Sequence, residues 1–181
     1  MFEALGAKLL TGVVSLSMLL FSSFQGNDPS LGNFSYSKTG SYVHLKAQLQ
    51  TAFENDFPSI FASGSDIPVH YNLEVISGGT VVAKRRMVYR VSYDPGTGIY
   101  EIVKNGSRAA LTESAEQVKR ELSAFAYALP YQRSWGVVTV KLEADLPKVH
   151  FAQLKKEVDL MVLWKYKKPA IKAQIDLRRD S

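Results

Sequence analysis

The sequence contains no cysteine and only three histidines among its 181 residues. The lack of cysteine excludes a disulfide framework, a thiolate nucleophile, a thiolate metal site and a lipid-modified N-terminal cysteine. Four common motifs are also missing: the G-x-x-x-x-G-K-[ST] phosphate loop, the G-x-G-x-x-G dinucleotide pattern, the G-x-S-x-G elbow and the H-E-x-x-H zinc motif. We therefore expect a protein that is not an enzyme and holds no cofactor and no metal.

The composition is that of an ordinary globular chain. Hydrophobic residues make up 46% of it and charged residues 22%, with a formal net charge of +5. This length and composition suit one domain with an N-terminal extension, and no internal repeat is present.

The N-terminus carries a long uncharged run. A short head ending at Lys8 is followed by the apolar stretch Leu9–Phe24, and then by a polar, turn-rich segment. This pattern is typical of an export signal, and a membrane anchor is the alternative if the run stays uncleaved. We expect residues 1–25 to be a signal peptide or membrane anchor that places the domain in the periplasm or on the outer side of the inner membrane.

Alternating apolar and polar residues dominate the rest of the chain. We expect residues 26–42 to be a linker and edge strand, and residues 43–181 to form a single β-rich domain. The clearest alternation covers residues 43–49, 67–75, 138–144 and 171–177. Six or seven strands with one main helix predict an antiparallel α+β domain or a helix-decorated β-sandwich.

The main helix is expected at Glu113–Leu129. Thr112 or Ser114 supplies a cap, apolar residues recur at helical spacing, and Pro130 ends the pattern. A shorter helix or pair of turns is expected at residues 53–61. In residues 151–166 the spacing predicts a short helix followed by a strand.

A basic and aromatic stretch near the C-terminus is the first candidate site. Its members are Trp164, Lys165, Tyr166, Lys167, Lys168, Lys172, Arg178 and Arg179. Such a patch suits a polyanion or an anionic lipid, although nucleic acid is unlikely to be the partner of an exported chain. An edge strand protected by lysines is the favoured interpretation, because it explains the lysines and Pro169 together.

Lys84, Arg85 and Arg86 form a second, weaker candidate. Three consecutive charges interrupt the alternation of a long strand, so at least one of them points to the otherwise apolar face. The interruption marks a bulge, an anion site or the exposed end of a hairpin, and the hairpin end is the commonest of these.

The histidines and carboxylates give weaker hypotheses. His44 and His70 lie on polar strand faces, His70 shares its face with Glu74, and His150 is expected in a loop. A metal site at these residues would need further ligands, and solvated histidines are the favoured interpretation. The acidic residues Glu54, Asp56, Glu113 and Glu116 are interpreted as acids at helix ends or in loops.

Several segments also resemble a known family. They are the signal-like start, the strand leading into LQTAFENDFPSIFASGSDIPVHYNLEV, the aromatic strand MVYRVSYD, the GIYEI strand and VTVKLEADLPKV. These features resemble a family of bacterial exported domains of unknown function. The resemblance implies a β-rich exported domain with no known activity, and it transfers no site residues.

The first functional hypothesis is a non-enzymatic envelope protein that acts by binding, as an accessory subunit of a membrane-associated complex. Membrane contact would come through Leu9–Phe24, and protein partners are expected. The second hypothesis is a carrier or sensor of an apolar ligand, such as a lipid, held between the sheet and the Glu113–Leu129 helix. The third and weakest is an enzyme that uses His70 and Glu74.

Overall fold

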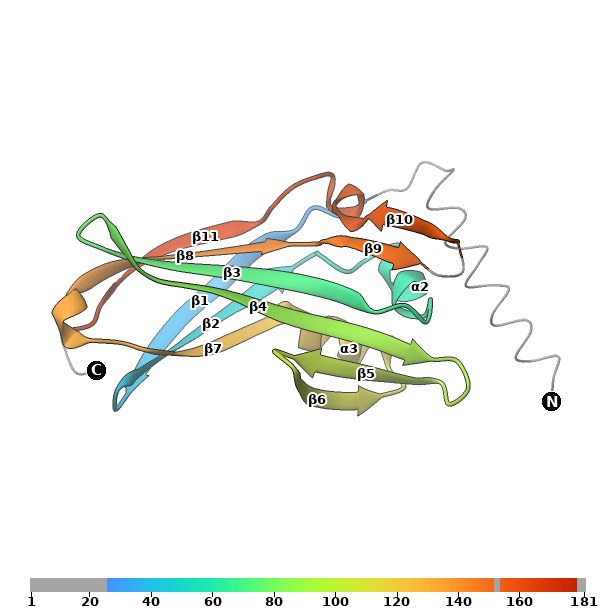
Figure 1. Ribbon diagram of the computed structural model, residues 1–181, viewed down its shortest axis with the longest axis horizontal. Coiled ribbons are helices and arrows are strands. Elements are labelled where there is room, and N and C mark those ends of the chain that lie inside the picture. Colours follow the sequence, from blue (N-terminus) through green and yellow to red (C-terminus); the bar gives the residue numbers. More distant parts are fainter. Residues whose placement is uncertain (1–25, 152–153, 179–181) are drawn as a thin grey trace.

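The computed structural model describes residues 26–151 and 154–178 (Figure 1). Leu9–Phe24, which the sequence predicts to be a signal peptide or anchor, lies outside these residues. Within them, no helix combines the length and the hydropathy needed to cross a bilayer.

Two antiparallel sheets carry the fold. The smaller sheet has the order β1-β2-β7, and the larger has the order β11-β8-β3-β4-β5-β6. The smaller sheet consists of β1 (Ser30–Thr39), β2 (Tyr42–Gln50) and β7 (Ala124–Pro130). The larger sheet consists of β3 (Ile67–Ser77), β4 (Thr80–Asp94), β5 (Ile99–Lys104), β6 (Ser107–Thr112), β8 (Val137–Asp145) and β11 (Ala170–Asp176).

The hydrophobic core lies between the two sheets. In Figure 1, β1, β2 and β7 pass behind β8, β3 and β4, and apolar residues of both sheets belong to one buried cluster. Every second residue of β3 from Ile67 to Val75 is at most 1% exposed, and β2 alternates in the same way from Val43 to Leu49. The alternation predicted from sequence is therefore confirmed, and the architecture is sandwich-like.

Shorter elements close the ends of the sandwich. They are the helices α2 (Phe57–Phe61) and α3 (Ala115–Ser123), the 3₁₀ turns η1 (Arg133–Trp135) and η2 (Leu160–Trp164), and the hairpin β9 (Lys148–Phe151) and β10 (Lys156–Asp159). With eleven strands in the described residues, the sheet content exceeds the six or seven strands predicted. Part of the excess is β1, which pairs with β2 from Ser30 to Thr39, so most of the expected linker is sheet.

The predicted helix Glu113–Leu129 is wrong in its second half. Ser114 caps α3 as expected, its Oγ accepting a hydrogen bond from the Gln117 N–H, but the helix ends at Ser123. The chain then continues as β7, which pairs with β2. The buried Tyr71 hydroxyl donates a 2.7 Å hydrogen bond to the Leu122 carbonyl, satisfying one of the acceptors that a helix end leaves free.

The predicted order of elements in residues 151–166 is also wrong. The strand β10 comes first, paired with β9, and the tight turn η2 follows. Leu163 and Trp164 are consecutive and both buried, at 1% and 0% exposure. A strand would turn them to opposite faces, whereas a 3₁₀ turn can place both against the core.

Candidate functional site

The C-terminal basic stretch does not form one surface patch. Trp164 is fully buried, and its indole N–H donates a 2.8 Å hydrogen bond to the Ala52 carbonyl. Tyr166, two residues later, is 65% exposed. The aromatic part of the predicted patch is thus divided between the core and the solvent.

The lysines after η2 are exposed and partly paired. The Lys167 ammonium lies 2.6 Å from an Asp28 carboxylate oxygen, and this hydrogen bond holds the pKa of Asp28 below its usual value. Lys168 lies 4.0 Å from Glu143. Further on, the Arg178 guanidinium makes two 3.0 Å hydrogen bonds to Asp176. Arg179 lies outside the described residues.

The three charges in β4 follow a bulge, one of the alternatives expected from sequence. Val75 pairs with Ala83 while Ile76 pairs with Val81, so β4 holds one extra residue, Val82, two positions before Lys84. Arg85 pairs with the buried Leu73, yet its own side chain is exposed, and its guanidinium donates a 2.8 Å hydrogen bond to the Lys84 carbonyl. Ala83 and Met87, its neighbours on the same face, are buried at 8% and 2% exposure, so Arg85 reaches solvent at the edge of β4 that no described strand pairs.

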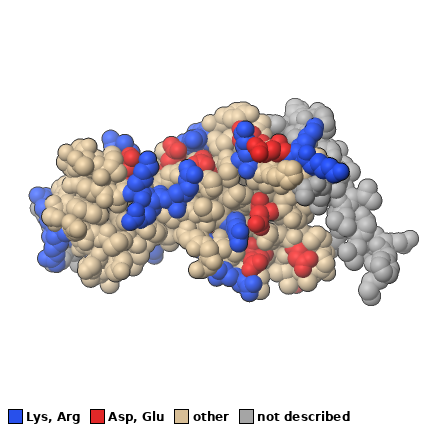
Figure 2. All heavy atoms as spheres, viewed as in Figure 1, with Lys and Arg blue, Asp and Glu red and all other residues tan. Residues whose placement is uncertain are grey.

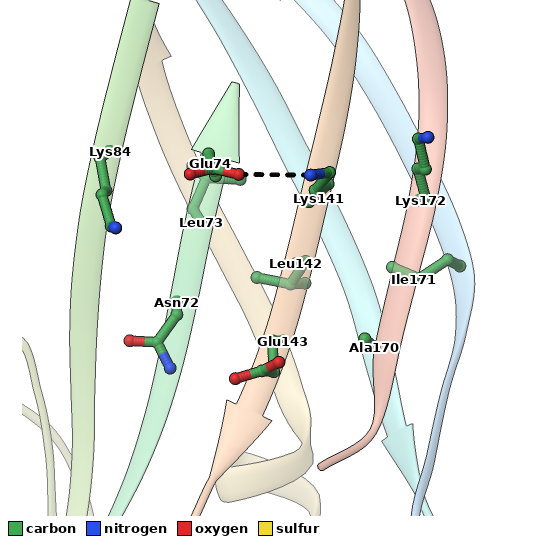
Figure 3. A pocket seen from close by; sticks show the side chains of 10 residues that line it. All are labelled: Asn72, Leu73, Glu74, Lys84, Lys141, Leu142, Glu143, Ala170, Ile171 and Lys172. Carbon is green, nitrogen blue, oxygen red and sulfur yellow. Dashed lines mark ion pairs between the residues drawn. The ribbon is translucent and has the colours of Figure 1, made fainter. Parts of the chain in front are cut away.

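Lys84 and Lys172, from the two separate candidates, lie at the two ends of one row on the outer face of the larger sheet. Across the strands β4, β3, β8 and β11, the register places Lys84, Glu74, Lys141 and Lys172 in one row. We call these four residues the lysine row. They line a shallow groove of about 410 Å³, the sheet groove, whose lining also includes Asn72, Leu73, Leu142, Glu143, Ala170 and Ile171 (Figure 3).

The lysine row has more positive than negative charge. Glu74 lies 3.5 Å from Lys141, but the two side chains are 30% and 47% exposed, so this ion pair is weak. Lys84 and Lys172 form no ion pair with any described residue. Lys172 stands directly opposite Lys141, an arrangement of like charges that is unfavourable in a sheet. Figure 2 shows basic side chains gathered on this face of the molecule, over β8, β3 and β4.

A polar network adjoins the sheet groove. The Arg86 Nε–H donates to Asn72 Oδ1 at 2.9 Å, and the Asn72 amide donates to Asp145 at 2.6 Å. The other oxygen of Asp145 lies 3.2 Å from Nδ1 of His70. The network links β4, β3 and β8 and fixes the side chains on one flank of the lysine row.

His70 and Glu74 do not form the pair that an enzyme hypothesis requires. They lie four residues apart on one straight strand, about 13 Å at ~3.3 Å per residue, and His70 contacts Asp145 instead. His44 projects from the outer face of the smaller sheet, and His150 lies on β9. Among residues 26–151 and 154–178, no group of three His, Asp or Glu side chains is placed to hold a metal ion.

Two of the four acidic candidates, Glu54 and Glu116, serve as surface ion-pair partners. Glu54 and Glu116 both contact Lys119, at 3.2 Å and 2.8 Å. The hydrogen bond with Glu116 is the largest cause of the raised pKa of Lys119. These contacts tie α3 to the loop before α2.

The space under α3 is filled by aromatic rings. The ring centroid of Tyr71 lies 5.1 Å from that of Tyr89 and 5.2 Å from that of Phe125. A second hollow of about 390 Å³ lies beside Ile99, Leu111 and the start of α3, and it opens at the surface. Neither hollow lies between the two sheets, and the ring packing counts against an apolar ligand there.

Lys141 and the Asn72–Asp145 bond are the features of this site that the sequence analysis missed. Lys141 was recognised only as a polar residue of an alternating strand. Its position between Glu74 and Lys172 follows from the antiparallel register of β3, β8 and β11, which no local pattern specifies.

No protein-family model and no curated protein matches the chain. Among solved structures, the solution structure of AT1g01470 from Arabidopsis thaliana is similar over 86% of this chain and 84% of its own length, with 8% sequence identity and a TM-score of 0.33. A likeness at this TM-score carries no argument about fold or function.

Proposed function

We propose that the chain is a non-enzymatic envelope protein, exported and held at a membrane by Leu9–Phe24, that binds an acidic segment of a protein partner in the sheet groove. The apolar run and the resemblance to exported domains support the location. The lysine row supports the binding role. Such a protein would act as an accessory subunit of a membrane-associated complex.

The observation that carries the proposal is the unfavourable charge arrangement of the lysine row. Three lysines share one glutamate, and two of the lysines face each other across β8 and β11. A carboxylate bound above the row would relieve this repulsion and gain ion pairs with lysines that no other side chain occupies.

The dimensions of the row suit an extended peptide. Neighbouring strands lie about 4.8 Å apart, so Lys84 and Lys172 are separated by roughly 14 Å. An extended peptide places side chains on one face every ~7 Å. Acidic residues at alternate positions of a segment that crosses the strands would therefore reach both ends of the row. The groove is shallow and open, which suits partner binding better than chemistry that must exclude water.

The test is binding of a synthetic octapeptide with glutamate at alternate positions, carrying a fluorophore, to the full chain in detergent. The triple variant Lys84→Gln, Lys141→Gln, Lys172→Gln should weaken binding roughly tenfold. Three exposed pairs at about 0.2–1 kcal/mol each sum to about 0.6–3 kcal/mol, and a tenfold change corresponds to about 1.4 kcal/mol. Binding of the wild type should also weaken as salt rises.

The matched control is Lys46→Gln, Arg120→Gln, Lys155→Gln, which removes the same charge from exposed side chains outside the groove. If both triple variants weaken peptide binding equally, the loss depends on net charge and not on the groove, which would contradict the proposal. Unchanged binding by the groove variant would contradict it as well. Tighter binding of inorganic phosphate than of the peptide would reject an acidic protein segment as the ligand.

A further inference from the structure

The point at which the described chain begins is firmly fixed to the domain. The Asn27 N–H donates a 2.7 Å hydrogen bond to the Leu163 carbonyl, and Asn27 Oδ1 accepts one from the Glu54 N–H at 3.1 Å. The Asn55 amide donates to the Gly26 carbonyl at 2.7 Å. Asn27 is only 4% exposed. The chain therefore enters the domain at a fixed site against η2, not through a loose linker.

This site determines where the apolar run is joined. Leu9–Phe24 ends two residues before Gly26, and two residues of extended chain span at most about 7 Å. Any membrane that holds the run must therefore approach the domain at this end. In Figure 1 the entry lies near η2 and β10, while the turn between β3 and β4 lies at the opposite end of the long axis.

Two lysines flank the entry. A Cβ atom added to Gly26 would lie 3.0 Å from Cε of Lys165, so the Lys165 side chain runs alongside the entering chain. Lys167 contacts Asp28, two residues into the domain, at 2.6 Å. Both lysines are exposed, and they lie on either side of Tyr166 in the sequence.

Tyr166 is held outward by an unusual backbone. Lys165 and Tyr166 both adopt left-handed conformations, with φ of 50° and 59°, which cost energy in residues other than glycine. The Tyr166 N–H donates to the Met161 carbonyl and the Lys167 N–H to the Trp164 carbonyl, both at 2.8 Å. The fold thus maintains a strained turn whose result is a tyrosine at 65% exposure, and such strain is commonly found at functional positions.

We infer that Lys165, Tyr166 and Lys167, which we call the entry face, contact the headgroup layer of an anionic bilayer. Tyrosine is enriched at the membrane–water interface, and a lysine near an anionic surface contributes about 1 kcal/mol of attraction. The inference rests on the membrane tether in the proposed function and adds an orientation to it. The domain stands with its entry face on the membrane and its β3–β4 turn away from it, and the sheet groove is open to a partner from the side.

The absence of cysteine makes the test direct. Single cysteines at Tyr166→Cys and, separately, Val137→Cys are labelled with an environment-sensitive fluorophore in the full chain. Val137 is 45% exposed and begins β8 at the far end, so it is the matched control. Each protein is reconstituted into phosphatidylcholine vesicles with and without 30% phosphatidylglycerol, with spin-labelled headgroups as quencher. A third single-cysteine variant, Lys168→Cys, carries the label two residues away, so that membrane contact is also measured with Tyr166 in place.

At position 166 we expect at least a twofold rise in fluorescence and strong headgroup quenching, greater with phosphatidylglycerol and reduced by salt. At position 137 we expect neither. A chain that inserts but shows labels 166 and 168 as water-exposed as label 137 would overturn the entry face and leave the tether intact. A chain that does not associate with vesicles would overturn the tether itself, and the entry face with it. Peptide binding by the groove is measured independently of both.

Discussion

Replacing Tyr71 with phenylalanine tests the contribution of one buried hydroxyl, which links β3 to the end of α3. Tyr71 is 0% exposed, and its hydroxyl donates to the Leu122 carbonyl at the end of α3. Phenylalanine keeps the ring that packs on Tyr89 and Phe125. The substitution leaves a buried carbonyl without this donor, which costs about 1–3 kcal/mol. Urea unfolding at pH 8 should show this loss as a lower midpoint with an unchanged slope.

The same substitution should change how stability depends on pH. Burial, and secondarily the neighbouring Tyr89, raises the pKa of Tyr71 well above 10 in the folded state. Above pH 10 the unfolded chain loses this proton while the folded chain keeps it, so stability falls as pH rises. At pH 11 this contribution is on the order of 1 kcal/mol. The difference between wild type and Tyr71→Phe should therefore shrink by about that amount from pH 8 to pH 11.

Tyr93→Phe is the matched control, because Tyr93 lies on β4 and its hydroxyl makes no hydrogen bond with any described residue. This control should change stability by less than about 0.5 kcal/mol at either pH. If Tyr71→Phe behaves like Tyr93→Phe, the hydroxyl does not hold the end of α3, and our account of the helix-to-strand junction is refuted.

Two further substitutions test the core and the sheet edge. Trp164→Phe removes the indole donor to the Ala52 carbonyl and leaves a void in the core. We expect the free energy of unfolding, measured in urea, to fall by about 2–3 kcal/mol. A fall of less than about 1 kcal/mol would place the ring outside the core. The double variant Arg85→Thr, Arg86→Thr removes two charges from the part of β4 whose edge away from β3 pairs with no described strand. Light scattering should then show self-association, because charged side chains protect such an edge. Arg90→Thr, in the part of β4 that pairs with β5, is the control and should not cause self-association.

The strands β3 and β8 were predictable because one face of each is buried. In β3 and β8 the apolar residues occupy alternate positions, which is the pattern expected of a sheet with one solvent-exposed face and one buried face. The segment after Ser123 was not predictable in this way. Phe125 and Leu129 satisfy the helical spacing set by Val118 and Leu122, but Phe125, Tyr127 and Leu129 also satisfy strand spacing. Pairing with β2, a tertiary contact, decides between the two.

The sheet groove was predictable only in its residue types. Lysines on polar strand faces are visible in the sequence, but the groove requires Lys84, Lys141 and Lys172 to share one row. A shift of the register by one residue would turn each of these side chains to the other face. Register depends on the whole hydrophobic pattern and on the bulge in β4, so the row appears only when the strands are paired.

The three consecutive basic residues of β4 do not share one surface, so their proximity in the sequence did not predict a common role. Arg85 is exposed and bonds a backbone carbonyl of its own strand, which suits protection of the unpaired edge of β4. Lys84 and Arg86 lie on the opposite face of the strand, where Lys84 lines the groove and Arg86 donates to Asn72, another lining residue. Edge protection and binding are therefore not competing explanations for one cluster, because different members of the same run occupy different surfaces. It follows that charge changes confined to the edge should alter self-association and leave peptide binding intact, while changes in the lysine row should do the reverse.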